Sequence, residues 1–249
     1  MTEYSHDNIV PFKDSDKSKK QQVAEMFNKI AFRYDFMNRF LSVGIDQYWR
    51  KTAIKQLMDV KPRYILDVAT GTGDLAIMTA KLIAPEKIIG IDISEGMLEL
   101  GRKKVEKEML NDKIALQVGD SEAINFPDNT FDAITVAFGI RNFEDLDKGL
   151  AEMKRVLKPG GKLVILEFSK PKQPIFSGLY NVYMKVFAPG VASWVSKNKE
   201  AYSYLHSSVK AFPEGETFLH ILQKHGYSST TLKRLSLGIC TIYCGRKEE

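Results

Sequence analysis

The sequence predicts an α/β domain built on a mostly parallel sheet of seven strands, with one antiparallel terminal strand and helices on both faces. Strand and helix patterns alternate between residues 63 and 168, which is typical of parallel strands joined by crossover helices. Two later apolar runs, at 228–235 and 239–246, are close enough to form a terminal hairpin. The length of 249 residues suits a single domain of this class.

Two segments precede the predicted sheet. Residues 1–20 are polar and rich in Lys, Asp and Ser, so we expect them to form a flexible N-terminal segment. Residues 21–60 are expected to form a helical cap, because apolar side chains recur at helical spacing from Val23 to Leu41. The domain itself is expected to span residues 21–249.

The remaining elements are predicted in chain order. Strands are expected at 63–68, 87–92, 113–118, 131–137 and 161–168, with helices at 74–83, 95–108 and 144–157. Pro159-Gly160-Gly161 is expected to end the last of these helices and to turn the chain into the fifth strand. Helical segments at 174–188, 198–210 and 215–225 then precede the hairpin, and the first two lie in an insertion at 172–212.

Composition narrows the class of protein. No apolar run approaches the ~18 residues of a membrane span, and a cytoplasmic protein is expected. The net charge is +5, but basic residues are not clustered as densely as in nucleic-acid-binding proteins, so no nucleic-acid partner is expected. Cys240 and Cys244 share one predicted strand, where they lie too far apart for a disulfide. No His or Cys cluster has the spacing of a metal site, so no metal is predicted.

A glycine-bearing turn follows the first predicted strand. The segment from Ile65 to Asp74 is an apolar run, then a tight turn containing Gly71 and Gly73, then the start of a helix. Such a turn at the carboxyl end of a parallel strand lets backbone N–H groups approach a ligand. The next strand ends in Asp92, a carboxylate suited to a ribose diol. Together these features predict a nucleotide-like ligand.

The turn alone leaves two ligand classes open. Gly71, Gly73 and Ala76 satisfy the loose pattern of dinucleotide-binding proteins, so a nicotinamide or flavin cofactor is one interpretation. A pyrophosphate, however, binds at a helix N-terminus whose positive end is accessible, and Asp74 in the first turn would repel it. Asp67 adds a second carboxylate near the turn. Two acids favour a ligand with positive charge, such as the ammonium and sulfonium of S-adenosylmethionine.

Several motifs resemble a known group of enzymes. Leu66–Asp74, Gly90–Ser94 and Arg155–Gly161 resemble the class I S-adenosylmethionine-dependent methyltransferases. Tyr34–Asn38, Phe126–Asp132, Phe138–Asn142 and Leu166–Pro171 further resemble the ubiquinone/menaquinone biosynthesis C-methyltransferase family. The resemblance covers residues 20 to 246 and implies a Rossmann-like class I methyltransferase fold. It also implies S-adenosylmethionine as the methyl donor.

The resemblance implies a set of cofactor-binding residues. Thr72 would lie in the glycine turn, Asp92 on the ribose hydroxyls, and Asp120 and Ser121 near the adenine. Ala137 follows the fourth strand at a position that some members fill with a serine, whose hydroxyl is lost here. Asp120 could instead cap a turn. With the turn residues and the nearby acid, the predicted cofactor-binding set is Asp67, Gly71, Thr72, Gly73, Asp92, Asp120, Ser121 and Ala137.

The substrate implied by the resemblance is a polyprenylated quinol that is methylated on a ring carbon. The main expectation is the conversion of demethylmenaquinol to menaquinol in menaquinone biosynthesis. The alternatives are methylation of 2-methoxy-6-polyprenyl-1,4-benzoquinol in ubiquinone biosynthesis, both activities together, or methylation of another lipid or small molecule.

Three residues are predicted to be catalytic. Arg141 and Asn142 follow the fourth strand, where they could stabilise the phenolate that makes the ring carbon nucleophilic. Arg141 could instead pair with Glu144 or Asp145 and brace the loop. Tyr34 is expected to close the pocket from the N-terminal helix, or to be a core aromatic residue.

The insertion at 172–212 suggests a further partner. Its aromatic side chains are Phe176, Tyr180, Tyr183, Phe187, Trp194, Tyr202 and Tyr204, and they are interleaved with Lys185, Lys197 and Lys199. Aromatic and basic side chains are favoured at membrane interfaces. We therefore expect an apolar lining for the prenyl tail and peripheral contact with an anionic membrane surface, at the inner face of the membrane. The alternative is an ordinary helical core.

Overall fold

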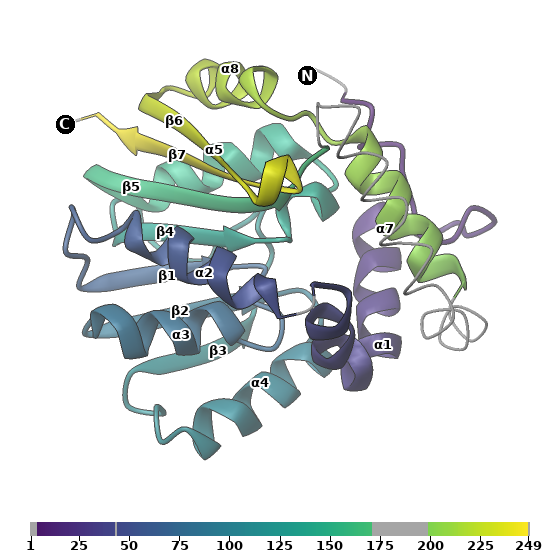
Figure 1. Ribbon diagram of the computed structural model, residues 1–249, viewed down its shortest axis with the longest axis horizontal. Coiled ribbons are helices and arrows are strands. Elements are labelled where there is room, and N and C mark those ends of the chain that lie inside the picture. The colour runs from purple at the N-terminus through teal and green to yellow at the C-terminus, as the bar shows by residue number, and fades with distance from the viewer. Residues whose placement is uncertain (1–3, 43, 171–198, 249) are drawn as a thin grey trace.

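A seven-stranded sheet forms the centre of the molecule in the computed structural model (Figure 1). The structure describes residues 4–42, 44–170 and 199–248, without the side chains of residues 33, 34, 36–42, 199, 200 and 202. The strand order is β3-β2-β1-β4-β5-β7-β6. From β1 the chain adds β2 and β3 on one side and then β4 and β5 on the other. The carboxyl ends of β1 and β4 therefore lie side by side at the point where the strand order reverses, which is where ligands usually bind in such sheets.

The strands confirm the predicted parallel sheet with one antiparallel member. They are β1 (Tyr64–Val68), β2 (Lys87–Asp92), β3 (Ile114–Val118), β4 (Phe131–Ala137), β5 (Leu157–Phe168), β6 (Tyr227–Leu235) and β7 (Cys240–Lys247). The four pairs among β1 to β5 are parallel. β7 runs antiparallel to both of its neighbours, β5 and β6. The terminal hairpin is thus the source of the antiparallel strand.

Helices cover both faces of this sheet. They are α1 (Lys19–Ser42), α2 (Ile45–Lys55), α3 (Asp74–Ile83), α4 (Glu95–Lys107), α5 (Leu146–Val156), α7 (Lys199–Ala211) and α8 (Glu216–Lys224), with short 3₁₀ turns at η1 (Ile140–Asn142) and η2 (Ser236–Gly238). One buried cluster joins α2, α3 and α4 to the sheet, and another joins α5 and α8. Helices α1 and α7 lie beside the carboxyl ends of the parallel strands (Figure 1).

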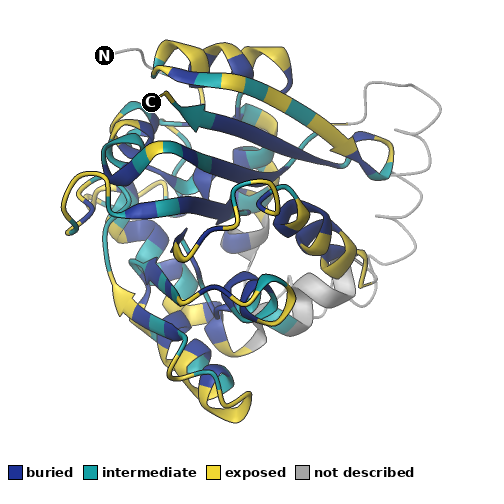
Figure 2. Cartoon of the chain, turned by 90° about the vertical axis from the view of Figure 1, so that its left-hand side faces the viewer, coloured by how far each residue is buried: buried dark blue, intermediate teal, exposed yellow. Residues whose placement is uncertain are grey.

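Alternation along β1 shows how the sheet sorts its side chains. Ile65 belongs to the cluster under α2 and α3, whereas Leu66 and Val68 belong to the cluster under α5. All three are fully buried, and the central strands are accordingly dark blue in Figure 2. Each such side chain stabilises the fold by about 1.5–3 kcal/mol relative to an exposed one. The sheet is therefore a rigid support for whatever its ends carry.

The fifth strand begins earlier than the sequence predicts. We expected it at 161–168, but β5 starts at Leu157, which pairs with Phe131. The register shifts between Phe131 and Ala133, and Gly160 has a φ of 73°. The Pro-Gly-Gly run therefore forms an irregular part of the strand rather than a loop before it, because glycine tolerates this backbone conformation.

The N-terminal segment packs on the domain where the structure describes it. The Tyr4 hydroxyl donates a hydrogen bond to Asp147 at 2.7 Å. His6 is fully buried, with its ring edge-on to Phe212 at 5.2 Å between centroids. Lys19 Nζ donates to the His6 carbonyl oxygen at 2.7 Å. The flexibility of residues 1–20 in solution stays a prediction.

The helix expected at 174–188 lies outside the described residues.

Candidate functional site

A cleft opens at the carboxyl edge of the sheet, beneath α1. Its empty volume is about 630 Å³, counting the part open to solvent. Its lining comes from the ends of β1, β2, β3 and β4, from the segments that follow them, and from α1. The lining residues are Lys20, Val23, Phe27, Ala69, Gly71, Asp92, Ile93, Met97, Gly119, Asp120, Ser121, Glu122, Ala137, Phe138, Gly139, Asn142, Phe143 and Glu144.

Asp92 is held against the glycine turn. Gly71 has a φ of 56°, and its N–H donates to Asp92 Oδ2 at 2.8 Å. The N–H of Ser94 donates to Oδ1 at 2.9 Å. Burial raises the pKa of Asp92, and these backbone donors oppose that effect. The carboxylate thus has a fixed position at the cleft, and each oxygen still has a lone pair to accept from a ligand hydroxyl.

Asp120 and Ser121 line the cleft at the end of β3. Asp120 Oδ1 accepts the Glu122 N–H at 2.9 Å, so the turn-capping interpretation is also correct for this residue. Lys20 Nζ lies 2.6 Å from Asp120 Oδ2 and 3.0 Å from Glu122 Oε2. Helix α1 therefore closes this end of the cleft with an ion pair.

Asp67 lies beneath the glycine turn rather than in the cleft wall. It is 2% exposed, and it accepts hydrogen bonds from the hydroxyls of Thr70 and Thr135, each at 2.6 Å. Burial raises the pKa of Asp67 to about 6, and the hydroxyl donors and the charge of Arg50 oppose that effect. Asp67 can therefore influence a ligand through its charge and through the turn that it supports.

The Thr72 hydroxyl belongs to a polar network beside the glycine turn. Its hydroxyl donates to Asp35 Oδ1 at 2.6 Å and accepts from Lys104 Nζ at 2.9 Å. Lys104 also pairs with Asp35 at 2.8 Å and with Asp74. The network ties α1 and α4 to the turn. It also offsets the charge of Asp74, so the repulsion of a diphosphate expected from the sequence is reduced. Gly73, at φ 75°, shapes the turn without lining the cleft.

Arg141 is buried behind the cleft wall. It is 4% exposed, and its Nη1 donates to Glu167 Oε1 at 2.8 Å and to the Phe138 carbonyl oxygen. The guanidinium carbon lies 5.6 Å from the centre of the Phe168 ring. The salt-bridge partner is thus Glu167, and not Glu144 or Asp145 as the loop-brace alternative supposed. Burial raises the pKa of Glu167, and the charge of Arg141 opposes that effect.

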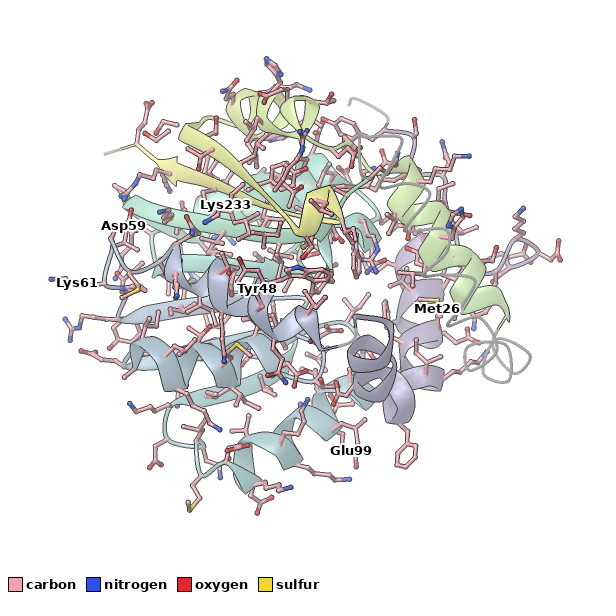
Figure 3. All side chains as sticks on the ribbon, in the orientation of Figure 1. Met26, Tyr48, Asp59, Lys61, Glu99 and Lys233 are labelled. Atoms are coloured by element: carbon pink, nitrogen blue, oxygen red, sulfur yellow. The ribbon has the colours of Figure 1, made fainter. Side chains whose placement is uncertain are left out.

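Asn142 brings an amide group to the cleft. Its side-chain Oδ1 accepts a hydrogen bond from the Tyr204 hydroxyl of α7 at 3.1 Å. Tyr204 packs with Met26 of α1, which is labelled in Figure 3. Burial raises the pKa of Tyr204, so its phenol donates at neutral pH. Ala137 lines the cleft nearby. Tyr34 lies in α1, but its side chain is outside the described residues.

Sequence reasoning missed two contributors to this site. Glu167 stands in a resemblance motif, and a charged residue within the apolar run Leu163–Phe168 was a usable signal for a buried ion pair. Lys20 gave no local signal, because its partner Asp120 is 100 residues away.

The described residues show neither a metal-binding cluster nor a membrane-spanning helix. Within residues 4–42, 44–170 and 199–248, no three or more His, Cys, Asp or Glu side chains are grouped to hold a metal ion. No helix in that part of the chain is long and apolar enough to cross a membrane. Cys240 and Cys244 are both buried free thiols.

Known sequences match along nearly the whole chain. The sequence model of the ubiE/COQ5 methyltransferase family matches residues 15–247. A demethylmenaquinone methyltransferase of Bacteroides fragilis is 49% identical over 244 residues, which are 98% of this chain and 99% of the relative. A ubiquinone/menaquinone biosynthesis C-methyltransferase of Geobacter sulfurreducens is 45% identical over 92% of this chain and 90% of the relative.

Solved structures share the fold at low identity. A phosphoethanolamine N-methyltransferase of Haemonchus contortus, in complex with S-adenosylmethionine, aligns with a TM-score of 0.67 at 16% identity, over 96% of this chain and 62% of that one. A SAM-dependent methyltransferase of Thermotoga maritima aligns with a TM-score of 0.63 at 20% identity, over 90% of this chain and 99% of that one. These structures support the class I methyltransferase fold expected from the sequence.

Proposed function

The chain belongs to the ubiE/COQ5 methyltransferase family, and we propose that it methylates a ring carbon of a polyprenylated quinol with S-adenosylmethionine as methyl donor. The observation that carries this proposal is the shared wall of one cleft. Asp92 and Asn142 both line it. Arg141, which immediately precedes Asn142 in the sequence, is buried. In this proposal the nucleoside of the methyl donor and the ring to be methylated occupy the same cleft.

The residues in the cleft fit the methyl donor. Asp92 can accept from both ribose hydroxyls, because two backbone N–H groups already fix its orientation. Asp120 and Ser121 suit the adenine, whose amino group needs an acceptor at the end of β3. Gly71 lets the ligand approach the backbone closely. When bound, S-adenosylmethionine supplies an electrophilic methyl group on a positively charged sulfur.

Methyl transfer to carbon requires an electron-rich ring. The carbon–methyl bond forms as the sulfur–methyl bond breaks, and the ring carbon then loses its proton to water or a carboxylate. An adjacent phenol that has lost its own proton makes the ring carbon more nucleophilic, so stabilising the phenolate lowers the barrier. Alignment and exclusion of water supply most of the remaining catalysis.

Asn142 and Arg141 are suited to stabilise that phenolate. With Oδ1 accepting from Tyr204, the Asn142 amino group can donate to an oxygen in the cleft. Arg141 lies behind this wall in an ion pair with Glu167, so it acts on the cleft as part of a buried dipole rather than as a net positive charge. Arginine is not a base at neutral pH, so its role is electrostatic. Tyr34 would close the pocket from α1.

A naphthoquinol is the preferred substrate within the proposal. The Bacteroides relative and a 43% identical protein of Deinococcus radiodurans are both called demethylmenaquinone methyltransferases. The reaction would convert demethylmenaquinol to menaquinol. The Geobacter relative is named for ubiquinone as well as menaquinone synthesis, so the benzoquinol substrate is the second candidate.

The prenyl tail connects this proposal to the membrane. A cytoplasmic enzyme acting on such a lipid would bind the inner face of the membrane peripherally, through the insertion at 172–212. Lys185, Lys197 and the side chain of Lys199 lie outside the described residues. Changing all three to Glu should reduce binding to anionic liposomes, most clearly at low salt. Wild-type protein that ignores such liposomes at low salt would end this part of the proposal.

Methyl transfer from deuterium-labelled S-adenosylmethionine tests the activity directly. The purified protein is incubated with a reduced short-chain demethylnaphthoquinol or the corresponding benzoquinol, and the products are analysed by mass spectrometry and NMR. The proposal predicts the label on a ring carbon, with the naphthoquinol preferred. Label on oxygen, or none on either quinol, would contradict it.

A further inference from the structure

Arg50 is a buried arginine whose Nε has no hydrogen-bond acceptor. The residue is 7% exposed, and its Nε donates no hydrogen bond. Asp46 forms an ion pair with Arg50, with 3.6 Å between its Oδ2 and Nε, which is beyond hydrogen-bond distance. Buried donors without acceptors destabilise a fold. An acceptor supplied by a ligand would remove that penalty.

The guanidinium lies beside one end of the cleft. Its central carbon is 5.3 Å from the centre of the Phe138 ring, and Phe138 lines the cleft at the end of β4. Its charge also opposes the rise in the pKa of Asp67 that burial causes. Arg50 is therefore close to the part of the cleft that β1 and β4 form.

The order of the strands predicts which part of the methyl donor reaches this place. In the proposed function, the adenine lies at Asp120 on β3 and the ribose at Asp92 on β2. The sheet continues as β3-β2-β1-β4. The rest of the ligand must therefore extend over β1 toward β4, and this remainder is the methionine portion, which carries an ammonium and a carboxylate.

We propose that Arg50 binds the carboxylate of the methionine portion of S-adenosylmethionine. This inference rests on the proposed function and deepens it. A guanidinium can hold a carboxylate with two parallel hydrogen bonds, which fixes both position and direction. Asp67 provides the complementary negative charge near the ammonium. Arg50 and Asp67 would then match the two opposite charges of the amino-acid group.

The test compares two ligands that differ only in this carboxylate. S-adenosylmethionine and decarboxylated S-adenosylmethionine are titrated calorimetrically into the wild type, Arg50→Met and Lys51→Met. Lys51 is the next residue on α2 and is exposed, so its variant loses the same charge without the buried group. Thermal unfolding confirms that each variant is folded. Arg50→Lys is included because lysine keeps the positive charge but lacks the two parallel N–H donors of the guanidinium.

We expect Arg50→Met to weaken S-adenosylmethionine binding by about ten- to a hundredfold, as for the loss of a charge-assisted pair. Its affinity for the decarboxylated ligand should equal that of the wild type, and Lys51→Met should bind both ligands normally. The affinity of Arg50→Lys for S-adenosylmethionine should lie between the affinities of the wild type and Arg50→Met. Equal losses for both ligands, no loss for either, or the same loss in Lys51→Met would overturn the proposal. Failure of the wild type to bind S-adenosylmethionine would instead reject the proposed function.

Discussion

Arg141 and Glu167 form an ion pair with 2.8 Å between Nη1 and Oε1, and both side chains are almost completely buried. The pair joins the turn after β4 to β5, behind the cleft wall that Asn142 helps to form. It could act as a structural brace, as an electrostatic element of catalysis, or as both. The two roles predict different behaviour when the partners are changed separately and together.

The structural role predicts a large loss of stability in single variants. Arg141→Met leaves a buried carboxylate without its cation, which should lower the free energy of unfolding by about 3–5 kcal/mol. The double variant Arg141→Met/Glu167→Gln removes both charges and should recover most of that loss. Urea denaturation measures Arg141→Met, Glu167→Gln and the double variant against the wild type. Additive losses in the double variant would show that the two residues are not energetically coupled.

The catalytic role predicts that activity does not recover with stability. In the double variant kcat should remain reduced by about tenfold, because the buried charges behind Asn142 no longer help to stabilise the phenolate. S-adenosylmethionine affinity should stay close to that of the wild type. Arg141→Lys keeps the charge and should retain more activity than Arg141→Met. A stable double variant with wild-type kcat would leave Arg141 only its role as a brace.

Removal of the Asp92 side chain should weaken cofactor binding. Asp92→Ala loses the acceptor for the ribose hydroxyls and for the Gly71 N–H, so affinity for S-adenosylmethionine should fall by about ten- to a hundredfold. Asp92→Asn keeps one acceptor oxygen and should lose less. Calorimetry gives both constants. Unchanged affinity in a folded Asp92→Ala protein would remove this residue from the binding site.

Asp67 should make stability depend on pH. Its pKa is raised to about 6 in the folded protein, against ~3.9 in an unfolded chain. The neutral carboxyl therefore stabilises the fold fully below pH ~4, and this contribution is lost as the pH rises through 6. The loss amounts to about 3 kcal/mol for a shift of this size.

Replacement of Asp67 by Asn should abolish that loss. The stability of Asp67→Asn relative to the wild type should increase between pH 4 and pH 7.5, measured by urea denaturation without ligand. Asp112→Asn, at an exposed position, is the control for a general change in charge. A stability difference that stays constant over this pH range would contradict the assignment.

Tyr204 should act on catalysis through Asn142. Tyr204→Phe removes the hydrogen bond to Oδ1 but keeps the ring that packs on α1. We expect kcat to fall by about three- to tenfold, as for the loss of one neutral hydrogen bond, with S-adenosylmethionine affinity unchanged. Tyr48→Phe, at the exposed position labelled on α2 in Figure 3, is the matched control. Equal kcat in both variants would show that Asn142 needs no support from α7.

The fold could be predicted because its strands and turns are encoded locally. The apolar run before Asp92 and the glycines of the first turn each act through neighbouring residues, and the structure confirms both. The partners of the site residues are distant in sequence. The hydroxyl of Thr72, for example, donates to Asp35, which is 37 residues away. No local pattern specifies such a contact, since it depends on how α1 docks on the sheet.

The quinone pool of cells that lack this protein tests the central claim most directly. Lipids are extracted from the deletion strain, from the wild type and from the strain complemented with the gene, and quinones are identified by mass spectrometry. The account predicts that the deletion strain accumulates a naphthoquinone lighter by one methylene unit and that complementation restores the methylated form. An unchanged quinone pool in the deletion strain would contradict the account.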